Sequence, residues 1–290
     1  ISLLLPLNIT DVICSERPKT CVLSSAKFST KTSKILFSKD LFMFVWFSNN
    51  SFCTFSNLFI EIFLSTSLFI TFNKSSSSIQ KGESDYDTLK TLEQYCNIIV
   101  VRHPSKKFIF NYSPNCHVPL INGGNGDGEH PTQALLDLYT IKKYFHDKPL
   151  NILFVGDVKH SRTIHSLENL LSLYSNINID YYPYPYCERD NGNHITSYDN
   201  IHNYDVVYMT RLQKERFESK SESNIDINKF ILTKKIVEKM KENSIILHPL
   251  PRNEELDISV DECKQAKYFE QMKNGVYIRM AILYHHLRSM

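Results

Sequence analysis

Arginine and histidine residues recur in this sequence directly after short apolar runs, where they could bind small anions. Arg102 follows IIVV, His130 follows VPLI across a glycine-rich loop, and Arg162 follows NILFVG. Arg211 comes after YDVVYM, and the turn HPLPR comes after SIIL. Arginine binds a planar carboxylate or phosphate through two parallel hydrogen bonds, which lysine cannot do. In a chain with 24 Lys and only 9 Arg, this placement predicts a site for one or two small substrates that carry several negative charges.

His130 stands where the glycine-rich loop meets the start of a predicted helix. Glycines let the loop turn sharply and approach a ligand, and Pro131 suits the first position of a helix. The positive end of that helix favours a neutral imidazole, which can donate a hydrogen bond. With Gln133 in the first turn, this corner could polarise a carbonyl group or bind an anion. Helix capping alone would also explain His130. The loop matches neither GxGxxG nor GxxxxGK[ST], so a nucleotide site is not indicated.

The predicted elements bring these residues to one side of the protein. Runs rich in β-branched residues predict strands at 98–101, 118–121, 151–156, 204–209 and 244–247. Apolar residues at helical spacing predict helices at 132–145, 163–174, 233–241 and 274–287, and a polar surface loop is expected at 191–203. Such alternation predicts parallel sheets covered on both faces. Ligands of these sheets bind beyond the carboxyl ends of the strands, so the polar clusters should share one rim.

The composition limits the classes of function. The chain has 290 residues, is 42% hydrophobic and carries a formal net charge of +2. This length has room for two domains, and the near-neutral charge gives no overall field for nucleic acid. Seven scattered cysteines without a CxxC pair indicate free thiols in a reducing compartment and no zinc site. We therefore expect a cytoplasmic protein that binds no nucleic acid and no metal.

Residues 1–77 differ in composition from the rest of the chain. They are rich in Phe, Ser, Leu and Ile, and their longest apolar runs are 41–47 and 58–72. Both runs are shorter than the roughly 18 to 20 residues that cross a membrane. We therefore expect no membrane association, with tethering through 41–72 left as an alternative. Because the chain also begins with Ile1, we expect a fragment or an incorrectly predicted gene, in which 1–77 is an atypical segment.

Four segments resemble the signatures of the aspartate carbamoyltransferase family. They are GGNGDGEHPTQALLDLYTI, GDVKHSRTIHSL, MTRLQKER and HPLPRNEE, which stand in family order within about residues 78–290. Related ornithine enzymes usually carry HCLP and lack the TRxQ element, so aspartate is the indicated second substrate. The resemblance implies an α/β protein of two domains, each a parallel sheet flanked by helices. The carbamoyl-phosphate-binding domain would comprise 78–140 and 270–290, and the aspartate-binding domain 141–269.

The resemblance also implies an activity and roles for individual residues. Members of this family transfer the carbamoyl group of carbamoyl phosphate to L-aspartate in de novo pyrimidine biosynthesis, without a metal or organic cofactor. The catalytic residues would be Arg102, His130 and Gln133. Carbamoyl phosphate would contact Ser77, Lys81, Arg102, His130, Gln133, Pro249 and Leu250, and aspartate would contact Lys81, Arg162, Arg211 and Gln213. The family forms homotrimers, in which Ser77 and Lys81 would lie on a loop that reaches into a neighbouring subunit's site.

One family motif has no clear counterpart. The main phosphate-binding sequence is Ser-Thr-Arg-Thr at a helix start, and the nearest segment here is Ser29-Thr30-Lys31-Thr32, with Lys in place of Arg. Without the motif, the phosphate would lose a helix N-terminus and an arginine. Three alternatives therefore stand beside an active enzyme. The chain could be a catalytically impaired homologue, a silent homologue that binds a partner, or a different carbamoyltransferase.

Overall fold

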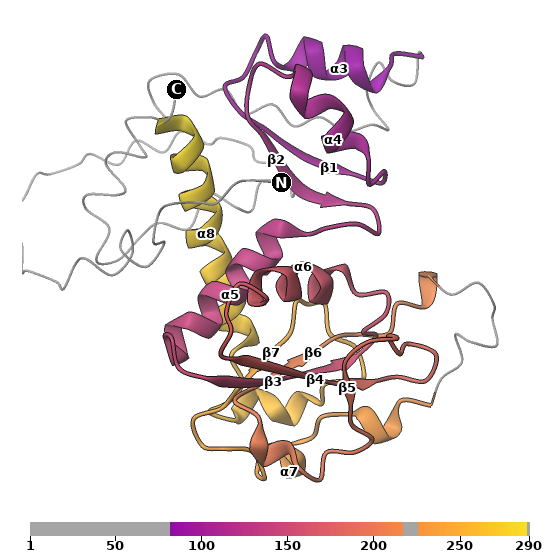
Figure 1. Ribbon diagram of the computed structural model, residues 1–290, viewed down its shortest axis with the longest axis vertical. Coiled ribbons are helices and arrows are strands. Elements are labelled where there is room, and N and C mark those ends of the chain that lie inside the picture. The colour runs from indigo at the N-terminus through magenta and orange to yellow at the C-terminus, as the bar shows by residue number, and fades with distance from the viewer. Residues whose placement is uncertain (1–81, 217–225, 289–290) are drawn as a thin grey trace, which may run out of the picture. The chain divides into compact units, whose positions relative to one another are not determined.

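A computed structural model of the chain describes residues 82–216 and 226–288 (Figure 1). The chain divides into two units, residues 1–69 and 70–290, and every element described below belongs to the second unit. Ser77, Lys81 and the segment 29–32 lie outside the described residues. Within the described ranges, no helix combines the length and the apolar character needed to span a membrane.

The larger sheet consists of five parallel strands in the order β5-β4-β3-β6-β7. Their bounds are β3 Leu150–Gly156, β4 Ile177–Pro183, β5 Asn193–His194, β6 Val206–Met209 and β7 Ile245–Leu247. β3 is the central strand, where Leu153 pairs with Asp180 of β4 and with Val207 of β6. Every residue of β6 and β7 is buried, as expected for parallel strands that are covered on both faces.

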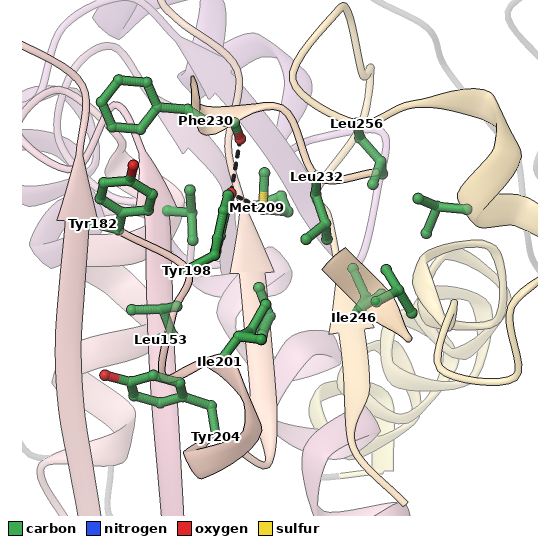
Figure 2. Close-up of a cluster of buried hydrophobic side chains, with 14 of the residues drawn as sticks. Leu153, Tyr182, Tyr198, Ile201, Tyr204, Met209, Phe230, Leu232, Ile246 and Leu256 are labelled. Carbon is green, nitrogen blue, oxygen red and sulfur yellow. Dashed lines mark hydrogen bonds between the residues drawn. The ribbon is translucent and has the colours of Figure 1, made fainter. Parts of the chain in front are cut away.

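Two apolar clusters cover the two faces of this sheet. On one face, α5 (Pro131–Phe145) and α6 (Arg162–Leu171) bury Ile141 and Leu167 against Phe154 of β3. On the other face, aromatic rings pack around Tyr198, whose hydroxyl donates a 2.7 Å hydrogen bond to the carbonyl oxygen of Phe230 (Figure 2). The short helix α7 (Lys234–Val237) lies on this second side, opposite α6 (Figure 1).

A smaller sheet consists of β1 (Ile99–His103) and β2 (Leu120–Asn125), which pair in parallel. Helices α3 (Asp85–Leu92) and α4 (Phe108–Tyr112) flank it, and Leu89, Ile99 and Phe108 form its small core. Short 3-10 helices complete the described elements, at Ser113–Asn115, Ile201–Asn203, Lys214–Arg216, Asn228–Phe230 and Ile258–Glu262.

The last helix, α8 (Tyr268–Arg288), packs along α5. The Asn274 side-chain amide donates to the hydroxyl of Thr140 at 3.0 Å. Gly275 allows a close approach, because a Cβ atom there would lie 3.1 Å from Leu136 Cδ2. The chain therefore returns from the end of the larger sheet to the helix that begins at the glycine-rich loop.

The described structure confirms the predicted α/β fold with parallel sheets and contains all five predicted strands. The predicted helix 233–241 is too long, since α7 ends at Val237. The surface loop predicted at 191–203 is wrong in part, because Tyr198 and Ile201 are buried. Sequence analysis also missed β4, since Asn178 and Asp180 interrupt its apolar pattern.

We predict that Ile152→Ala destabilises the protein by about 2–5 kcal/mol, because it opens a cavity in the central strand. Ile152 is 0% exposed. The free energy of unfolding should be measured in urea. Leu173→Ala is the control, since Leu173 is 72% exposed and its truncation should change stability by less than about 0.5 kcal/mol. Equal effects of the two substitutions would contradict the described core.

Candidate active site

The glycine-rich loop between β2 and α5 is fixed at both of its ends. At its start, the N–H of Gly126 donates to the carbonyl oxygen of His103 at 2.8 Å. Gly126 has a φ of 58°, and a Cβ atom there would lie 1.9 Å from the carbonyl oxygen of Pro104, so only glycine fits. At its end, the N–H of His130 donates to Ser166 Oγ of α6 at 2.9 Å, which holds His130 against the side of α6.

Arg162 is the first residue of α6 and lies across this loop. One guanidinium N–H donates to the carbonyl oxygen of Gly126 at 2.5 Å. The guanidinium also lies 3.4 to 3.5 Å from the position that a Cβ atom on Gly124 would take, so this glycine leaves room for it. Burial, together with the positive charges of Arg102 and Arg216, lowers the pKa of Arg162. The guanidinium groups of Arg102 and Arg216 therefore both lie close enough to repel that of Arg162.

The three arginines reach this corner from separate elements. Arg102 lies on β1 and is exposed, and Arg162 lies at the start of α6. Arg216, at the end of the segment that follows β6, donates to the same carbonyl oxygen of Gly126 at 3.4 Å. Within the described ranges, neither Arg102 nor Arg162 forms an ion pair with a carboxylate. The corner therefore carries positive charge that a bound anion would offset.

His130 is a neutral imidazole at pH 7. Burial lowers its pKa to about 4, and the charges of Arg162, Arg102 and Arg279 act in the same direction. The hydroxyl oxygen of Thr132 lies 3.4 Å from His130 Nδ1. A hydroxyl that donates to Nδ1 leaves the proton of the ring on Nε2, where it can be donated to a ligand. The local geometry thus agrees with the neutral hydrogen-bond donor predicted from the helix start.

Gln133 and a buried carboxylate lie behind His130. Gln133 is in the first turn of α5 and is 5% exposed. Its amide Nε2 donates to Asp137 Oδ1 at 2.8 Å. Asp137 was not among the residues singled out from the sequence, although it stands four positions after Gln133, a spacing that places two helical residues on one face.

The segment after β6 leads from a cavity to the glycine-rich loop. Arg211 is half-buried and lines a cavity of about 560 Å³, together with Lys214 and the segment Asn253–Glu255. The N–H of Gln213 donates to Asp157 Oδ2 at 3.1 Å, which ties this segment to the turn after β3. Because Arg216 reaches Gly126, the segment connects the cavity that Arg211 lines with the corner that holds Arg162.

The turn after β7 is held by a buried histidine. His248 Nδ1 accepts a 2.8 Å hydrogen bond from the N–H of Leu250, so Nε2 carries the proton and donates to Glu255 Oε1 at 2.9 Å. Leu250 has a φ of 51°, and its peptide bond to Pro251 is cis. Pro249 and Leu250 are half-buried. Their backbone orientation is therefore fixed beside the end of β7.

Arg252 departs from the expectation that the strand-end arginines bind ligands. Its guanidinium forms an ion pair with Asp261, with one N–H donating to Oδ2 at 2.8 Å. Its guanidinium carbon also lies 5.6 Å from the ring centroid of Tyr268. These contacts fix the HPLPR turn to the 3-10 helix Ile258–Glu262, so Arg252 has a structural role.

One described cluster has the residue types of a metal site. Ligand atoms of Asp157, His160 and Cys187 all lie within 4.8 Å of one another. Hydrogen bonds already occupy the Asp157 carboxylate, because it accepts from the N–H groups of Gln213 and His160. Burial raises the pKa of the Cys187 thiol, which keeps it protonated and weakens it as a ligand. The cluster is therefore better suited to joining two loops than to binding a cation.

The structure brings part of the predicted site together. Arg102, His130 and Arg162 act on one another electrostatically, and Gln133 lies one helical turn from His130. Arg211, Gln213, Pro249 and Leu250 follow β6 and β7, which are neighbours in the larger sheet. Their roles toward substrate stay predictions, as do those of Ser77 and Lys81. Arg216 was missed, although it closes the quoted segment MTRLQKER.

These features are those of an α/β protein with a cationic site at the ends of its parallel strands. Sequence profiles of two domains match the chain. The profile "Aspartate/ornithine carbamoyltransferase, Asp/Orn binding domain" matches residues 148–286, and the profile "Aspartate/ornithine carbamoyltransferase, carbamoyl-P binding domain" matches residues 23–143. The chain belongs to the aspartate/ornithine carbamoyltransferase family. The second match begins within the segment 1–77 that sequence analysis set apart and includes residues 29–32.

Individual relatives agree with this family. The aspartate carbamoyltransferase catalytic subunit of Picrophilus torridus is 44% identical over 226 residues, which cover 73% of each chain. The multifunctional protein CAD of Squalus acanthias is 41% identical over 74% of this chain, which corresponds to 10% of that protein. The solved structure of aspartate transcarbamoylase from Trypanosoma cruzi in complex with carbamoyl aspartate and phosphate is 34% identical, covers 82% of this chain and 80% of that chain, and has a TM-score of 0.71. The resemblance to aspartate carbamoyltransferases is confirmed.

We predict that the imidazole of His130 titrates with a midpoint near pH 4 rather than at its ordinary value. Its depressed pKa of about 4 means that the folded protein excludes a proton which the unfolded chain binds below about pH 6.5. The folded state is therefore not penalised by His130 above about pH 6.5, and it loses stability as the pH falls from 6.5 toward 4. NMR of the ring C2–H, assigned with His130→Gln, measures the midpoint. Arg162→Gln should raise it, because the neighbouring positive charge is removed. A midpoint near 6.5 would contradict the buried, cationic setting.

Proposed function

We propose that this chain catalyses transfer of the carbamoyl group from carbamoyl phosphate to L-aspartate, with the corner around His130 as the reaction site. The observation that carries the proposal is the placement of Arg102 and Arg162 around a neutral imidazole, with Arg216 next to Arg162. Guanidinium groups bind phosphate and carboxylate, and an imidazole N–H can polarise a carbonyl oxygen. The confirmed family membership supports the same reaction.

Carbamoyl phosphate would bind at the start of α5. In the proposal, Arg102 and the Nε2–H of His130 donate to its carbonyl oxygen, and Gln133 contacts its amino group. The backbone carbonyls of Pro249 and Leu250 accept further hydrogen bonds from that amino group. When the tetrahedral intermediate forms, negative charge develops on the carbonyl oxygen, and donors already aimed at that atom lower the barrier. The fixed HPLP turn and the fixed glycine loop support such positioning.

Aspartate would bind between Arg162 and Arg211, one guanidinium for each carboxylate, with Gln213 alongside. Its amino nitrogen attacks the carbamoyl carbon, the bond from that carbon to the phosphate oxygen breaks, and the amino proton leaves with the phosphate group. The protein's main contribution is to hold two anions in contact despite their mutual repulsion, which is a positioning effect. The half-buried state of Arg162 and Arg211 supports this role, because partial desolvation strengthens each ion pair with substrate.

The assembly and location form part of the proposal. A homotrimer would let Ser77 and Lys81 of one subunit complete the site of its neighbour, as the family resemblance implies. A cytoplasmic location is supported by the free thiols of Cys96, Cys116, Cys187 and Cys263. The substrates need no metal or organic cofactor for this transfer.

The second candidate is a catalytically impaired homologue. It is favoured by one observation, the lack of a clear counterpart to the family's Ser-Thr-Arg-Thr motif, for which the nearest segment is Ser29-Thr30-Lys31-Thr32. Expression of residues 1–290 followed by an assay for carbamoyl aspartate tests the proposal directly. Sustained turnover supports the enzyme, whereas binding of carbamoyl phosphate in calorimetry without turnover favours the impaired homologue. Absence of both would favour a silent homologue.

We predict that Arg211→Ala raises the KM for aspartate far more than the KM for carbamoyl phosphate. The lost bidentate ion pair should raise the aspartate KM roughly tenfold or more, since a hydrogen bond to a charged group contributes about 1.5–3 kcal/mol. Steady-state kinetics with each substrate varied in turn makes the measurement.

Arg189→Ala is the matched control for this substitution. It removes a guanidinium whose partner is the carboxylate of Glu168, outside the proposed site. Both KM values of this control should stay within about twofold of the unmodified chain, since sites that share no partners act independently. Equal increases of the two KM values in Arg211→Ala would contradict the aspartate assignment.

A further inference from the structure

A fully buried carboxylate lies directly behind the proposed carbamoyl site. Asp137 is 0% exposed and accepts three hydrogen bonds from side chains. Gln133 Nε2 and Gln271 Nε2 donate to Oδ1 at 2.8 and 2.6 Å, and the hydroxyl of Tyr208 donates to Oδ2 at 2.7 Å. Each buried oxygen therefore has at least one donor, as a buried carboxylate requires.

The three donors come from three different elements. Gln133 belongs to α5, Tyr208 to β6 and Gln271 to α8. Gln271 also accepts a 2.9 Å hydrogen bond from the N–H of His248 through its Oε1. Asp137 thus stands between the helix that carries Gln133 and the turn that carries Pro249 and Leu250, the two regions proposed to contact the carbamoyl amino group.

The chemistry of a carboxylate fixes which end of the Gln133 amide faces it. An ionised carboxylate only accepts hydrogen bonds, so Gln133 must turn its NH₂ group toward Asp137. The amide oxygen Oε1 then points away from Asp137. Within the described residues, no donor contacts this oxygen. The Gln133 amide therefore offers one acceptor and a second N–H to any ligand at the start of α5.

The charge state of Asp137 supports this orientation. Burial raises its pKa to about 7, while hydrogen bonds from Gln271, Tyr208 and Gln133 and the positive charge of Arg279 oppose the increase. Arg279, on α8, is half-buried and is the cation that acts on this carboxylate. Above neutral pH the ionised form of Asp137 predominates. This form only accepts hydrogen bonds, so it fixes the orientation of the Gln133 side-chain amide.

We propose that Asp137 is a positioning residue that holds Oε1 of Gln133 toward the amino group of the carbamoyl moiety. The inference rests on the proposed function and adds a basis for specificity to it. A carbamoyl group carries an NH₂ donor where an acetyl group carries a methyl group, so an oriented acceptor favours carbamoyl phosphate over acetyl phosphate. A methyl group would leave Oε1 without a donor, which is unfavourable in a buried site.

The test compares kcat/KM for carbamoyl phosphate and acetyl phosphate in the full chain at pH 8.5, where Asp137 is ionised. In Asp137→Asn the side chain can donate as well as accept, so the Gln133 amide is no longer held in one orientation. The ratio of the two kcat/KM values should fall about tenfold, the effect of losing one well-oriented hydrogen bond. Turnover of acetyl phosphate should change much less, because the acetyl group makes no use of Oε1.

Tyr208→Phe is the matched control, because it removes the donor to Oδ2 and leaves the contact between Gln133 and Oδ1. It should preserve the preference for carbamoyl phosphate within about twofold, as expected for a partner on the other oxygen. An unchanged ratio in Asp137→Asn, whether both kcat/KM values fall equally or neither changes, would overturn the inference, since it indicates a structural role only.

Lack of turnover and failure of the variant to fold call for separate measurements. If the unmodified chain turns over neither substrate, the proposed function fails, and the ratio of the two dissociation constants in calorimetry then tests the orientation by the same tenfold criterion. If Asp137→Asn does not fold, the side-chain amide protons of Gln133, assigned with Gln133→Met, provide the test. Their NMR shifts should follow the Asp137 titration, with a midpoint of about 7, and shifts that are independent of pH would overturn the inference.

Discussion

The arrangement of the site depends on the carbonyl oxygen of Gly126, which accepts hydrogen bonds from two cations. Arg162 and Arg216 both donate to this atom, although one lies at the start of α6 and the other after β6. Their charges repel each other and also repel Arg102, which lowers the pKa of Arg162. Only a glycine fits at this position, because any Cβ atom would overlap the Pro104 carbonyl group. The glycine-rich loop therefore serves mainly to hold positive charges together at a distance that an anion can bridge.

Buried carboxylates hold the loops and helices that carry the residues of the proposed site. Asp157 joins the turn after β3 to the segment of Gln213, and Glu255 orients His248 in the turn after β7. Asp137 joins α5 to β6 and α8. In each case a buried carboxylate accepts several hydrogen bonds, so that its removal would leave donors without partners. The cationic rim is thus supported by buried carboxylates whose hydrogen bonds join the elements that carry it.

Sequence reasoning succeeded where a single signal decided the structure. The continuous apolar runs of β3, β6 and β7 were recognised because both faces of these strands are buried. It failed at β4, whose polar residues alternate with apolar ones, and at Tyr198, whose buried hydroxyl is satisfied by a carbonyl group far along the chain. The HPLPR turn was grouped with the anion-binding strand ends because the partner of Arg252, Asp261, cannot be identified from sequence spacing alone. Likewise, Asp137 could only be assigned once its partners on β6 and α8 were known.

The charges of the described residues indicate how much substrate binding would depend on the missing phosphate motif. Carbamoyl phosphate carries a phosphate group with about −1.5 to −2 charges, and aspartate adds two carboxylates beside its attacking amine. The described guanidinium groups of Arg102, Arg162, Arg211 and Arg216 bring four positive charges to the strand ends. These four charges nearly balance the two substrates without a contribution from residues 29–32. A helix start with a Ser-Thr-Arg-Thr sequence would then act chiefly by directing the phosphate oxygens, since backbone N–H groups provide direction as well as charge. On this argument, a chain without the motif would orient the leaving group poorly while still binding carbamoyl phosphate, so the loss belongs in kcat rather than in the affinity for carbamoyl phosphate.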